Sequence, residues 1–455
     1  MEQMGELLER VGHKPAAALE TLGCKVNQYE SAHLLSLLAG EGFRIVPFQE
    51  TADLYVVHSC AVTARAAYQT RQLLRRARRR NPQAQIVVAG CGAQLEPDRF
   101  EAEGLATHIL GNPEKHDLPE FLSQPASLAR PLKAVSNPRL CSTLQALPVQ
   151  GMGKGRSRAY LRIQDGCDAF CTYCVVPYTR GKSRSLHGEE VRRQMSRFVE
   201  AGFHEVVLTG IHLGRWGKDL QPASDLSSLI VSLTEGQEGW GRIRLSSLEP
   251  MEITPSLLSV LRSNPSICSH FHVPLQHGDE AILARMRRPY SPGYYAEVLF
   301  ELRRLFPRAS IGADVMVGFP GETEREFQNT YSLIEVLPLT YLHVFPFSPR
   351  PGTPAAEWKD RPRGRDVQRR AKVLWGLGGR KKKAFSESFL GQKLQVLVET
   401  PLGGGWWQGT SDNYLKVRFY SPTPLAQGCL VWVSCERPEE DGLSGKLFEG
   451  GLNLL

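Results

Sequence analysis

Long hydrophobic runs are the first feature that this sequence lacks. No apolar stretch among its 455 residues approaches the roughly 18 residues that span a bilayer. The opening "MEQMGELLERVGHKP" is charged and has no apolar core of the kind found in a secretory signal. We therefore expect a cytoplasmic protein with no membrane partner. In that reducing compartment the ten cysteines are expected to be metal ligands or free thiols rather than disulfides.

Acidic residues are missing from one strongly basic segment. Residues 65–80 contain seven arginines and no aspartate or glutamate, and residues 360–383 contain ten basic and two acidic residues. Within a formal net charge of +8, such clumping favours a polyanionic partner, RNA or DNA. A solvated helix face would explain either cluster equally well.

A fourth cysteine is missing from the most compact cysteine cluster. The stretch "QDGCDAFCTYCVVPYTRG" contains Cys167, Cys171 and Cys174. A structural zinc site takes four protein ligands, and a dithiol redox motif needs only two cysteines. Thiolates select iron–sulfur clusters or zinc over hard cations. Since a four-iron cluster needs one ligand per iron, three cysteines would leave one iron open to a small molecule.

A second set of three cysteines follows strand-like segments near the N-terminus. "AALETLGC", "ADLYVVHSC" and "AQIVVAGC" alternate with helical patterns, which predicts a flavodoxin- or Rossmann-like parallel sheet with helices on its faces. Each strand ends close to a cysteine: Cys24, Cys60 and Cys91. The carboxyl ends of parallel strands share one edge, where ligands bind. A single such cysteine is usually a small buried hydrophobe, so the repetition is what favours a shared site.

The central segment continues the alternation of strands and helices. Between residue 158 and about residue 350, six strand candidates are separated by helical patterns, which predicts a partial (β/α) barrel with functional loops at the strand carboxyl ends. Four polar residues are expected at or just after strand ends: Glu249, Gln276, His277 and Glu322. Residues 120–157 are rich in Pro, Gly and Ser and are interpreted as a linker.

The segment after Lys383 changes to short alternating β-runs, which predict a small antiparallel barrel. Its aromatic residues interleave with Lys416 and Arg418. These aromatics are Trp406, Trp407, Tyr414, Phe419 and Tyr420. They could stack on nucleic-acid bases or fill the core of the barrel itself.

The C-x3-C-x2-C spacing, with Tyr173 before the last cysteine and a barrel strand ahead of it, resembles the radical S-adenosylmethionine superfamily. The resemblance implies a [4Fe-4S] cluster on the 167–174 cysteines. It also implies that S-adenosylmethionine occupies the open iron and is cleaved to a 5′-deoxyadenosyl radical. Four residues are candidate contacts to this cofactor, although each is equally explained as a turn or barrel-end residue: Tyr173, Gly210, Glu249 and Gln276.

Further motifs narrow the resemblance to the methylthiotransferases of that superfamily. "TLGCKVNQYES", "HSCAVTARA" and "VVAGCGAQ" resemble their N-terminal domain. This implies a second [4Fe-4S] cluster on Cys24, Cys60 and Cys91. The implied order is a methylthiotransferase domain at 14–135, a radical core at 153–384 and an RNA-binding TRAM barrel at 385–455. An electron donor such as flavodoxin or ferredoxin and a sulfur source are implied partners.

The first cysteine motif is most similar to the branch that acts on N6-threonylcarbamoyladenosine at position 37 of transfer RNA, beside the anticodon. This similarity implies transfer of a methylthio group to carbon 2 of that adenine, with S-adenosylmethionine used both as methyl donor and as radical source. Branches that act on isopentenyladenosine or on a ribosomal protein aspartate remain alternatives. A non-catalytic RNA-binding protein with metal sites is a more distant one.

The sequence departs from the family at one loop. "PLQHGDE" stands where the family often has "PLQSGS", which places His277 and Asp279 after a strand. His277 could contact the substrate or donate a proton. We interpret it instead as a solvated loop histidine.

Overall fold

The structure is a computed structural model that describes residues 14–149, 151–152, 155–235 and 241–448. The N-terminal segment and parts of the predicted linker therefore lie outside the described residues. The chain forms two compact units. The first comprises residues 1–150, 165–184 and 348–357, and the second comprises 151–164, 185–347 and 358–455.

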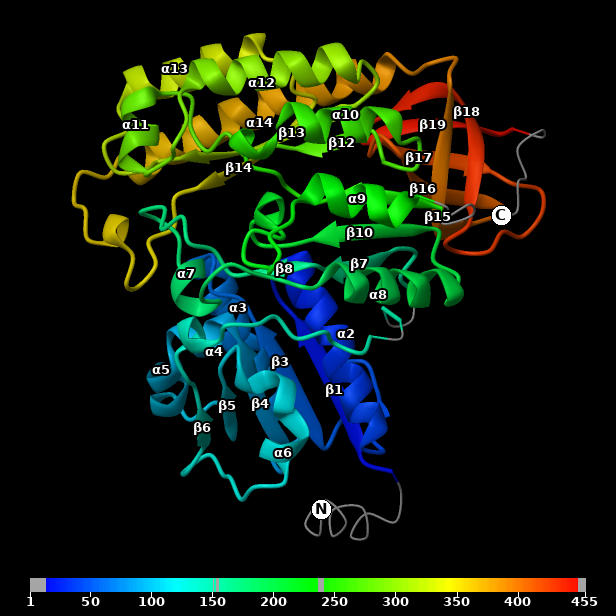
Figure 1. The fold of residues 1–455 in the computed structure, drawn as a ribbon. Helices are drawn as coiled ribbons and strands as arrows, with labels where there is room; N and C mark the ends of the chain where they lie inside the picture. Colours follow the sequence, from blue (N-terminus) through cyan, green and yellow to red (C-terminus); the bar gives the residue numbers. More distant parts are fainter. Residues whose placement is uncertain (1–13, 150, 153–154, 236–240, 449–455) are drawn as a thin grey trace. The chain divides into compact units, whose positions relative to one another are not determined.

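The first unit is built on a six-stranded parallel sheet in the order β2-β1-β3-β4-β5-β6. Figure 1 labels its strands β1, β3, β4, β5 and β6. Its strands are β1 (Ala16–Thr21), β2 (Arg44–Ile45), β3 (Leu54–Ser59), β4 (Gln85–Gly90), β5 (His108–Leu110) and β6 (Leu132–Ala134). β3 is buried along its whole length, as expected of a central parallel strand covered on both faces. The parallel sheet predicted from the three apolar runs is confirmed, and the additional strands are only two or three residues long.

Helices cover both faces of this sheet. The helices are α2 (Lys25–Gly40), α3 (Ala64–Arg80), α4 (Cys91–Leu95), α5 (Pro97–Ala102) and α6 (Leu118–Leu122), with short 3-10 turns at Glu114–Asp117, Pro138–Leu140 and Pro354–Ala356. Leu74 of α3 packs in the apolar cluster on one face, and Leu34 of α2 packs in the cluster on the other. The strand order 2-1-3-4-5 is that of flavodoxin-like folds, in which the order reverses between β1 and β3.

Helix α3 shows why the arginine-rich segment folds as it does. The hydroxyl of Thr63 caps its N-terminus by accepting a hydrogen bond from the Ala66 N–H at 3.1 Å. Its buried residues are Ala67, Thr70, Leu74 and Ala77, which recur at helical spacing. The helix ends before Pro82. The arginines therefore occupy the outer faces of a helix whose inner face is apolar.

The second unit contains two three-stranded parallel sheets, in the orders β11-β10-β7 and β12-β13-β14. The strands are β7 (Ala159–Arg162), β10 (Glu205–Thr209), β11 (Arg242–Leu245), β12 (His270–His272), β13 (Ser310–Val317) and β14 (Tyr341–Pro346). An isolated parallel β-bridge pairs Ile243 of β11 with Ile267, which precedes β12, and so links the two sheets. The predicted partial barrel of six parallel strands is confirmed.

Helices follow these strands in the expected alternation. They are α8 (Gly188–Glu200), α9 (Leu226–Thr234), α10 (Pro255–Ser263), α11 (Glu280–Arg285), α12 (Pro292–Leu305), α13 (Glu324–Val336) and α14 (Gly364–Glu387), with 3-10 turns at Leu213–Arg215 and Pro250–Glu252. A short pair, β8 (Gln164–Asp165) with β9 (Arg184–Ser185), and helix α7 (Val176–Thr179) complete the described elements. In the part of the chain that the structure describes, no helix is both long enough and apolar enough to cross a membrane.

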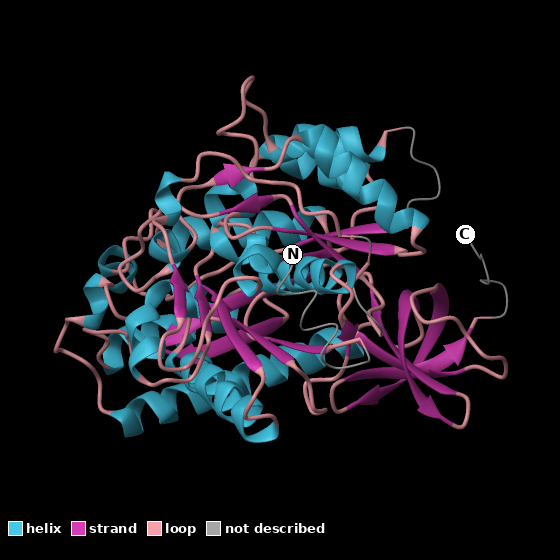
Figure 2. Ribbon diagram, turned by 90° about the horizontal axis from the view of Figure 1, so that it is seen from below, coloured by secondary structure: helices cyan, strands magenta, loops and turns pink. Residues whose placement is uncertain are grey.

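The C-terminal strands of the second unit close into a small barrel (Figure 2). They are β15 (Lys393–Gly403), β16 (Trp406–Ser411), β17 (Lys416–Tyr420), β18 (Leu430–Glu439) and β19 (Gly442–Leu447). The pairing of β17 with β19 is parallel, and the other pairings are antiparallel. We expected a wholly antiparallel barrel, and the pairing of β17 with β19 is the exception. Strand β18 pairs with β15, and β19, which pairs with β18, closes the barrel by pairing with β17. Phe419 and Cys435 lie in the barrel core.

A buried charge cluster holds this barrel against β10 and β11. The Glu205 carboxylate lies 2.6 Å from Arg242 Nε and 2.9 Å from Arg244 Nε. Arg242 also donates to the carbonyl oxygen of Thr410 at 2.8 Å, and Arg244 donates to that of Ser411 at 3.0 Å. Burial alone would raise the pKa of Glu205, but the two guanidinium groups hold it well below its ordinary value.

Candidate functional site

The structure brings together the three cysteines that follow β1, β3 and β4. Cys24 directly precedes α2, Cys60 follows β3 directly and Cys91 begins α4. Burial raises the pKa of Cys60 to about 12, and nearby Cys91 and Cys24 add to this increase. The three thiols are therefore close enough to interact electrostatically. They lie where the strand order reverses between β1 and β3, the position at which open parallel sheets bind ligands.

Two glycines next to cysteines of this triad lie in close contact with other side chains. Gly23 has a φ of +105°, and a Cβ at that position would lie 3.0 Å from Cys60 Sγ. Gly90 has a φ of +91° and would place a Cβ 2.6 Å from the His58 ring. Both positions need a residue without a side chain, because the backbone is left-handed and the neighbouring groups are already in contact.

Two amide side chains connect this first cysteine triad to the segment 165–184. Asn112 Nδ2 lies 3.4 Å from Cys91 Sγ and donates to the carbonyl oxygen of Thr179 at 2.6 Å. Asn27 Oδ1 lies 3.6 Å from Cys24 Sγ and accepts from Arg180 Nη2 at 2.6 Å. Neighbouring groups thus fix the positions of two thiols.

A buried network of four charges lies beneath the triad. Arg180 pairs with Glu30 at 3.0 Å and with Asp165 at 2.9 Å, and Lys115 Nζ lies 2.8 Å from Glu30. Burial lowers the pKa of Lys115, and Glu30 opposes this effect. Within this network Arg180 acts to lower the pKa of Cys60 and Cys24, against the larger opposite effect of burial.

The second triad lies on the loop between Asp165 and Arg184. The Cys167 N–H donates to the Gly181 carbonyl at 3.0 Å, and the Cys174 N–H donates to the Cys171 carbonyl at 3.0 Å. Gly166 has a φ of +75°, and a Cβ there would lie 1.9 Å from the Lys182 carbonyl oxygen. A tight turn at a required glycine therefore begins the cysteine loop.

Both triads belong to the first compact unit. Val175, which follows Cys174, shares an apolar cluster with Cys91 and with Ala61, which follows Cys60. Cys60, Cys91 and Cys171 are buried, while the remaining cysteine of the first triad, Cys24, is exposed and the other two of the second are partly exposed. Three soft thiol donors with one accessible side suit an iron–sulfur cluster with an open iron.

Comparison with known proteins identifies the family. Residues 16–111 match an uncharacterized protein family, UPF0004, and residues 161–334 match the radical SAM superfamily. The threonylcarbamoyladenosine tRNA methylthiotransferase MtaB of Bacillus subtilis is 37% identical over 88% of this chain and 90% of its own length. The protein of the same name from Aquifex aeolicus is 36% identical over 84% of this chain and 92% of its own. This chain belongs to the radical S-adenosylmethionine methylthiotransferases.

The methylthiotransferase also resembles a relative that is named for a different substrate. The tRNA-2-methylthio-N(6)-dimethylallyladenosine synthase of Pelotomaculum thermopropionicum is 33% identical over 90% of this chain and 93% of its own. Among solved structures, the radical S-adenosylmethionine methyltransferase TsrM of Kitasatospora setae superposes with a TM-score of 0.55 at 15% identity, covering 75% of each chain. That likeness shows a shared fold. The protein is an enzyme, and a non-catalytic metal protein is not supported.

Three of the residues predicted to contact S-adenosylmethionine follow strands of the second unit. Gly210 comes after β10, and a Cβ there would lie 2.8 Å from Gln164 Oε1. Glu249 follows β11 and pairs with Arg288. Gln276 follows β12 with a φ of +62°. Tyr173 lies on the cysteine loop in the first unit, and the contact of these residues with S-adenosylmethionine stays a prediction.

The interpretation of His277 as a solvated loop residue was wrong. Its side chain is fully buried, with Thr330 Oγ1 3.2 Å from its Nδ1 and Glu322 3.8 Å from its Nε2. A Cβ on Gly278 would lie 2.6 Å from Thr330 Cα, so helix α13 packs directly over this loop. Asp279 caps α11 by accepting from the Ile282 N–H at 3.1 Å. The local sequence could not show this, because the covering helix is 50 residues away.

The polar residues around the first triad were not predicted from the sequence. Asn27 and Glu30 lie within "TLGCKVNQYES", and Arg180 lies within "VVPYTRG", so the motifs themselves contained the signal. Asn112 and Lys115 lie in no motif that we had recognised. Their role follows only from the distances in the folded unit.

Proposed function

We propose that this methylthiotransferase transfers a methylthio group to carbon 2 of N6-threonylcarbamoyladenosine at position 37 of transfer RNA. The observation that carries the proposal is the similarity to proteins named for that activity. The relatives from Bacillus subtilis, Aquifex aeolicus and Thermotoga maritima are 34–37% identical over more than four-fifths of this chain. The motif around Cys24 supports the same branch. Relatives named for the dimethylallyladenosine reaction are 33% and 34% identical, so the substrate is the point to test.

Two [4Fe-4S] clusters are part of the proposal. One would be held by Cys167, Cys171 and Cys174, and the other by Cys24, Cys60 and Cys91. When bound, the cluster on Cys167, Cys171 and Cys174 supplies the electron that cleaves S-adenosylmethionine. The cluster on Cys24, Cys60 and Cys91 presents sulfur for methylation and transfer. The support is that each triad offers three thiols and an accessible side.

The residues around the first triad have defined tasks in this account. Arg180 supplies positive charge close to Cys60 and Cys24 and acts to lower the pKa of both thiols, which favours their ionised form. The Asn112 side-chain N–H points to Cys91 Sγ, and hydrogen bonds to cluster sulfurs tune a cluster. The ion pair between Arg180 and Asp165 holds the beginning of the second cysteine loop in the same unit.

The remaining parts of the proposal concern the cofactor and partners. S-adenosylmethionine would contact Tyr173, Gly210, Glu249 and Gln276. An electron donor such as flavodoxin or ferredoxin and a sulfur source complete the reaction, which we place in the cytoplasm. The domain division predicted from the sequence, 14–135, 153–384 and 385–455, also stays a prediction.

Recognition of transfer RNA is proposed to use exposed aromatic and basic groups. Trp406 and Tyr420 are exposed on the barrel with ring centroids 6.0 Å apart, and Arg418 lies over the Trp406 ring at 5.8 Å. Aromatic faces beside a guanidinium suit stacking on unpaired bases. Phe419 has no such role, because it lies in the barrel core.

The test is to express the protein in a bacterial strain that lacks its own transfer-RNA methylthiotransferases. Digested transfer RNA is then analysed by mass spectrometry of nucleosides. We expect the methylthio derivative of N6-threonylcarbamoyladenosine, and we expect none with a Cys171→Ala variant. Appearance of only the isopentenyladenosine derivative would assign the protein to the other branch. If neither product appeared although the purified enzyme cleaved S-adenosylmethionine, the proposal of a transfer-RNA substrate would be overturned.

A further inference from the structure

A group of histidine and carboxylate side chains lies on one face of the sheet β12-β13-β14, away from the cysteines in sequence. His272 ends β12, Asp314 lies within β13 and His343 lies within β14. In the strand register His272 pairs with Gly312, and Asp314 pairs directly with His343. Because side chains alternate along a strand, Gly312 and Asp314 face the same side. The three side chains are therefore brought to one point by adjacent strands.

The distances between these groups match those between the ligands of one metal ion. His272 Nε2 lies 3.1 Å from Asp314 Oδ1, and His343 Nδ1 lies 3.3 Å from the same oxygen. All three ligand atoms lie within 4.8 Å of one another. With metal–ligand bonds of about 2.0–2.1 Å, neighbouring ligands of a tetrahedral ion are about 3.3 Å apart. The site is thus already at the size that an ion requires.

A second layer of contacts orients His272. The Tyr341 hydroxyl lies 3.0 Å from His272 Nδ1 and 2.8 Å from His270 Nε2. A metal-bound histidine characteristically gives its other ring N–H to such a partner, which fixes the ring and its tautomer. Here His272 Nε2 would face the ion, and Nδ1–H would donate to the Tyr341 oxygen.

Gly312 makes this arrangement possible. A Cβ at this position would lie 1.9 Å from Tyr341 Cζ and 2.3 Å from its hydroxyl oxygen. The φ of Gly312 is not in the left-handed region, so backbone conformation does not require a glycine here. The close approach of the Tyr341 ring does. The Tyr341 ring crosses over Gly312 and in this way reaches the histidines of β12.

We propose that His272, Asp314 and His343 form a binding site for one divalent transition-metal ion, zinc or ferrous iron. Two imidazoles and one carboxylate are the donor set that such ions prefer, whereas magnesium and calcium prefer oxygen ligands alone. With three protein ligands the ion keeps an open position. This site is separate from the six cysteines and is independent of the proposed substrate.

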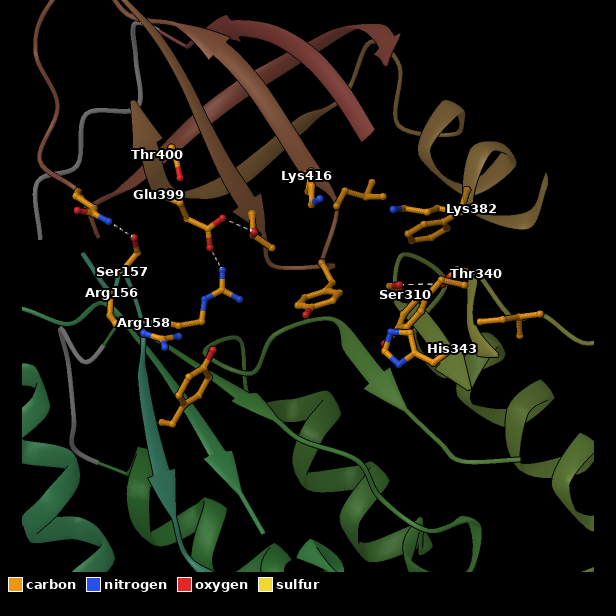
Figure 3. Close-up of a pocket in the computed structure, with 18 of the residues that line it drawn as sticks. Arg156, Ser157, Arg158, Ser310, Thr340, His343, Lys382, Glu399, Thr400 and Lys416 are labelled. Carbon is orange, nitrogen blue, oxygen red and sulfur yellow. Dashed lines mark hydrogen bonds and ion pairs between the residues drawn. The ribbon is translucent and has the colours of Figure 1, made fainter. Parts of the chain in front are cut away.

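The ion would be reachable from a cavity. His343 is 60% exposed and lines a cavity of about 520 Å³ between the small barrel and the amino ends of strands of the second unit. Figure 3 shows His343 beside Ser310 and Thr340, with Lys382 and Lys416 across the cavity. An ion can therefore enter, and a water molecule or an anionic ligand can take its open position.

The test uses full-length protein with its iron–sulfur clusters reconstituted. The protein is incubated with Zn²⁺ and desalted, and zinc and iron per chain are then measured by plasma mass spectrometry. We expect about one zinc per wild-type chain, and loss of that zinc in His343→Ala and Asp314→Asn with the cluster iron unchanged. Since His343 is largely exposed, its removal should leave the fold intact. His187→Ala, which removes an exposed histidine elsewhere, is the matched control and should retain zinc.

Two results would overturn the proposal. One is a wild-type chain that retains no zinc and carries no iron beyond its clusters. The other is zinc that remains equally bound in all variants, which would place it on cysteines or other surface groups. The histidines and Asp314 would then be a hydrogen-bonded cluster without an ion.

Discussion

The Arg180 guanidinium forms a two-point ion pair with the Glu30 carboxylate, with Nη2–Oε2 at 3.0 Å and Nη1–Oε1 at 3.2 Å. The two residues are 150 positions apart, and both side chains are almost completely buried. Arg180 lies on the second cysteine loop, and Glu30 lies on the helix that begins at the first triad. This pair therefore ties together the segments that carry the two sets of cysteines.

Removing Arg180 is predicted to destabilise the first unit strongly. In the Arg180→Leu variant the buried Glu30 would keep only Lys115 as a close cation, and Asp165 would keep only Arg184, 3.7 Å away. Breaking a buried pair costs about 3–5 kcal/mol. The measurement is urea unfolding of anaerobically purified protein. Arg193→Ala is the matched control, because Arg193 is exposed and pairs only at the surface with Glu190. Equal losses in both variants would contradict a structural role for the buried pair.

Glu205 gives the attachment of the small barrel a predictable pH dependence. Its pKa in the folded protein is held well below its ordinary value by Arg244 and Arg242. A depressed carboxyl pKa contributes stability above the unfolded-state value of about 4.3 and loses it as the pH falls toward the folded value. We expect Glu205→Gln to lower the free energy of unfolding by about 3–5 kcal/mol at neutral pH.

The difference between wild type and Glu205→Gln should be constant from about pH 6 to 8 and should shrink below about pH 4. Thermal unfolding followed by tryptophan fluorescence across this range measures it. A difference that does not change with pH would mean that Glu205 is not the group responsible.

The sequence revealed the positions that local pattern determines. Apolar runs followed by Cys24, Cys60 and Cys91 predicted strands, and the structure places each cysteine at or just after a strand end. The helical pattern between the second and third of these strands predicted a helix, and this segment folds as α3. These features depend on neighbours along the chain, which a single sequence displays.

Contacts between distant segments were beyond such patterns. The burial of Lys115 beside Glu30 was not predicted, because Lys115 is 85 positions from Glu30 and lies in no recognised motif. His277 read as a loop residue, because the helix that buries it begins at Glu324. The parallel pairing of β17 with β19 likewise depends on how the barrel closes.

The exposed arginines of α3 are predicted to contribute to binding of transfer RNA. Arg65, Arg76 and Arg79 are exposed, whereas Arg71 and Arg75 pair with Glu103. Each phosphate contact adds about 0.7–0.9 to the slope of log affinity against log salt. Replacing the three exposed arginines by glutamine should therefore reduce that slope by up to about 2–3.

Binding is measured by fluorescence anisotropy with unmodified transfer RNA between low and moderate salt. A variant with Arg71 and Arg75 replaced by glutamine is the comparison and should change the slope less. If the triple variant kept the wild-type slope, helix α3 would be a solvated surface and the contact would lie elsewhere.

Cys60→Ala is predicted to separate the two halves of the reaction. The second cysteine loop is untouched by this change, so cleavage of S-adenosylmethionine to 5′-deoxyadenosine should continue. Transfer of the methylthio group should stop, because one ligand of the first triad is lost. Chromatography of both products in one assay makes the measurement, with Cys171→Ala expected to abolish both. Full transfer by the Cys60→Ala enzyme would rule out a cluster at the first triad.

The central claim is that each cysteine triad holds its own four-iron cluster. The most direct measurement is iron and labile sulfide per chain in anaerobically reconstituted protein, for wild type and for a variant with Cys167, Cys171 and Cys174 all replaced by alanine. We predict about eight irons in wild type and about four in the variant. Four irons in wild type that fall to none in the variant would contradict the claim, and the N-terminal cysteines would then be structural.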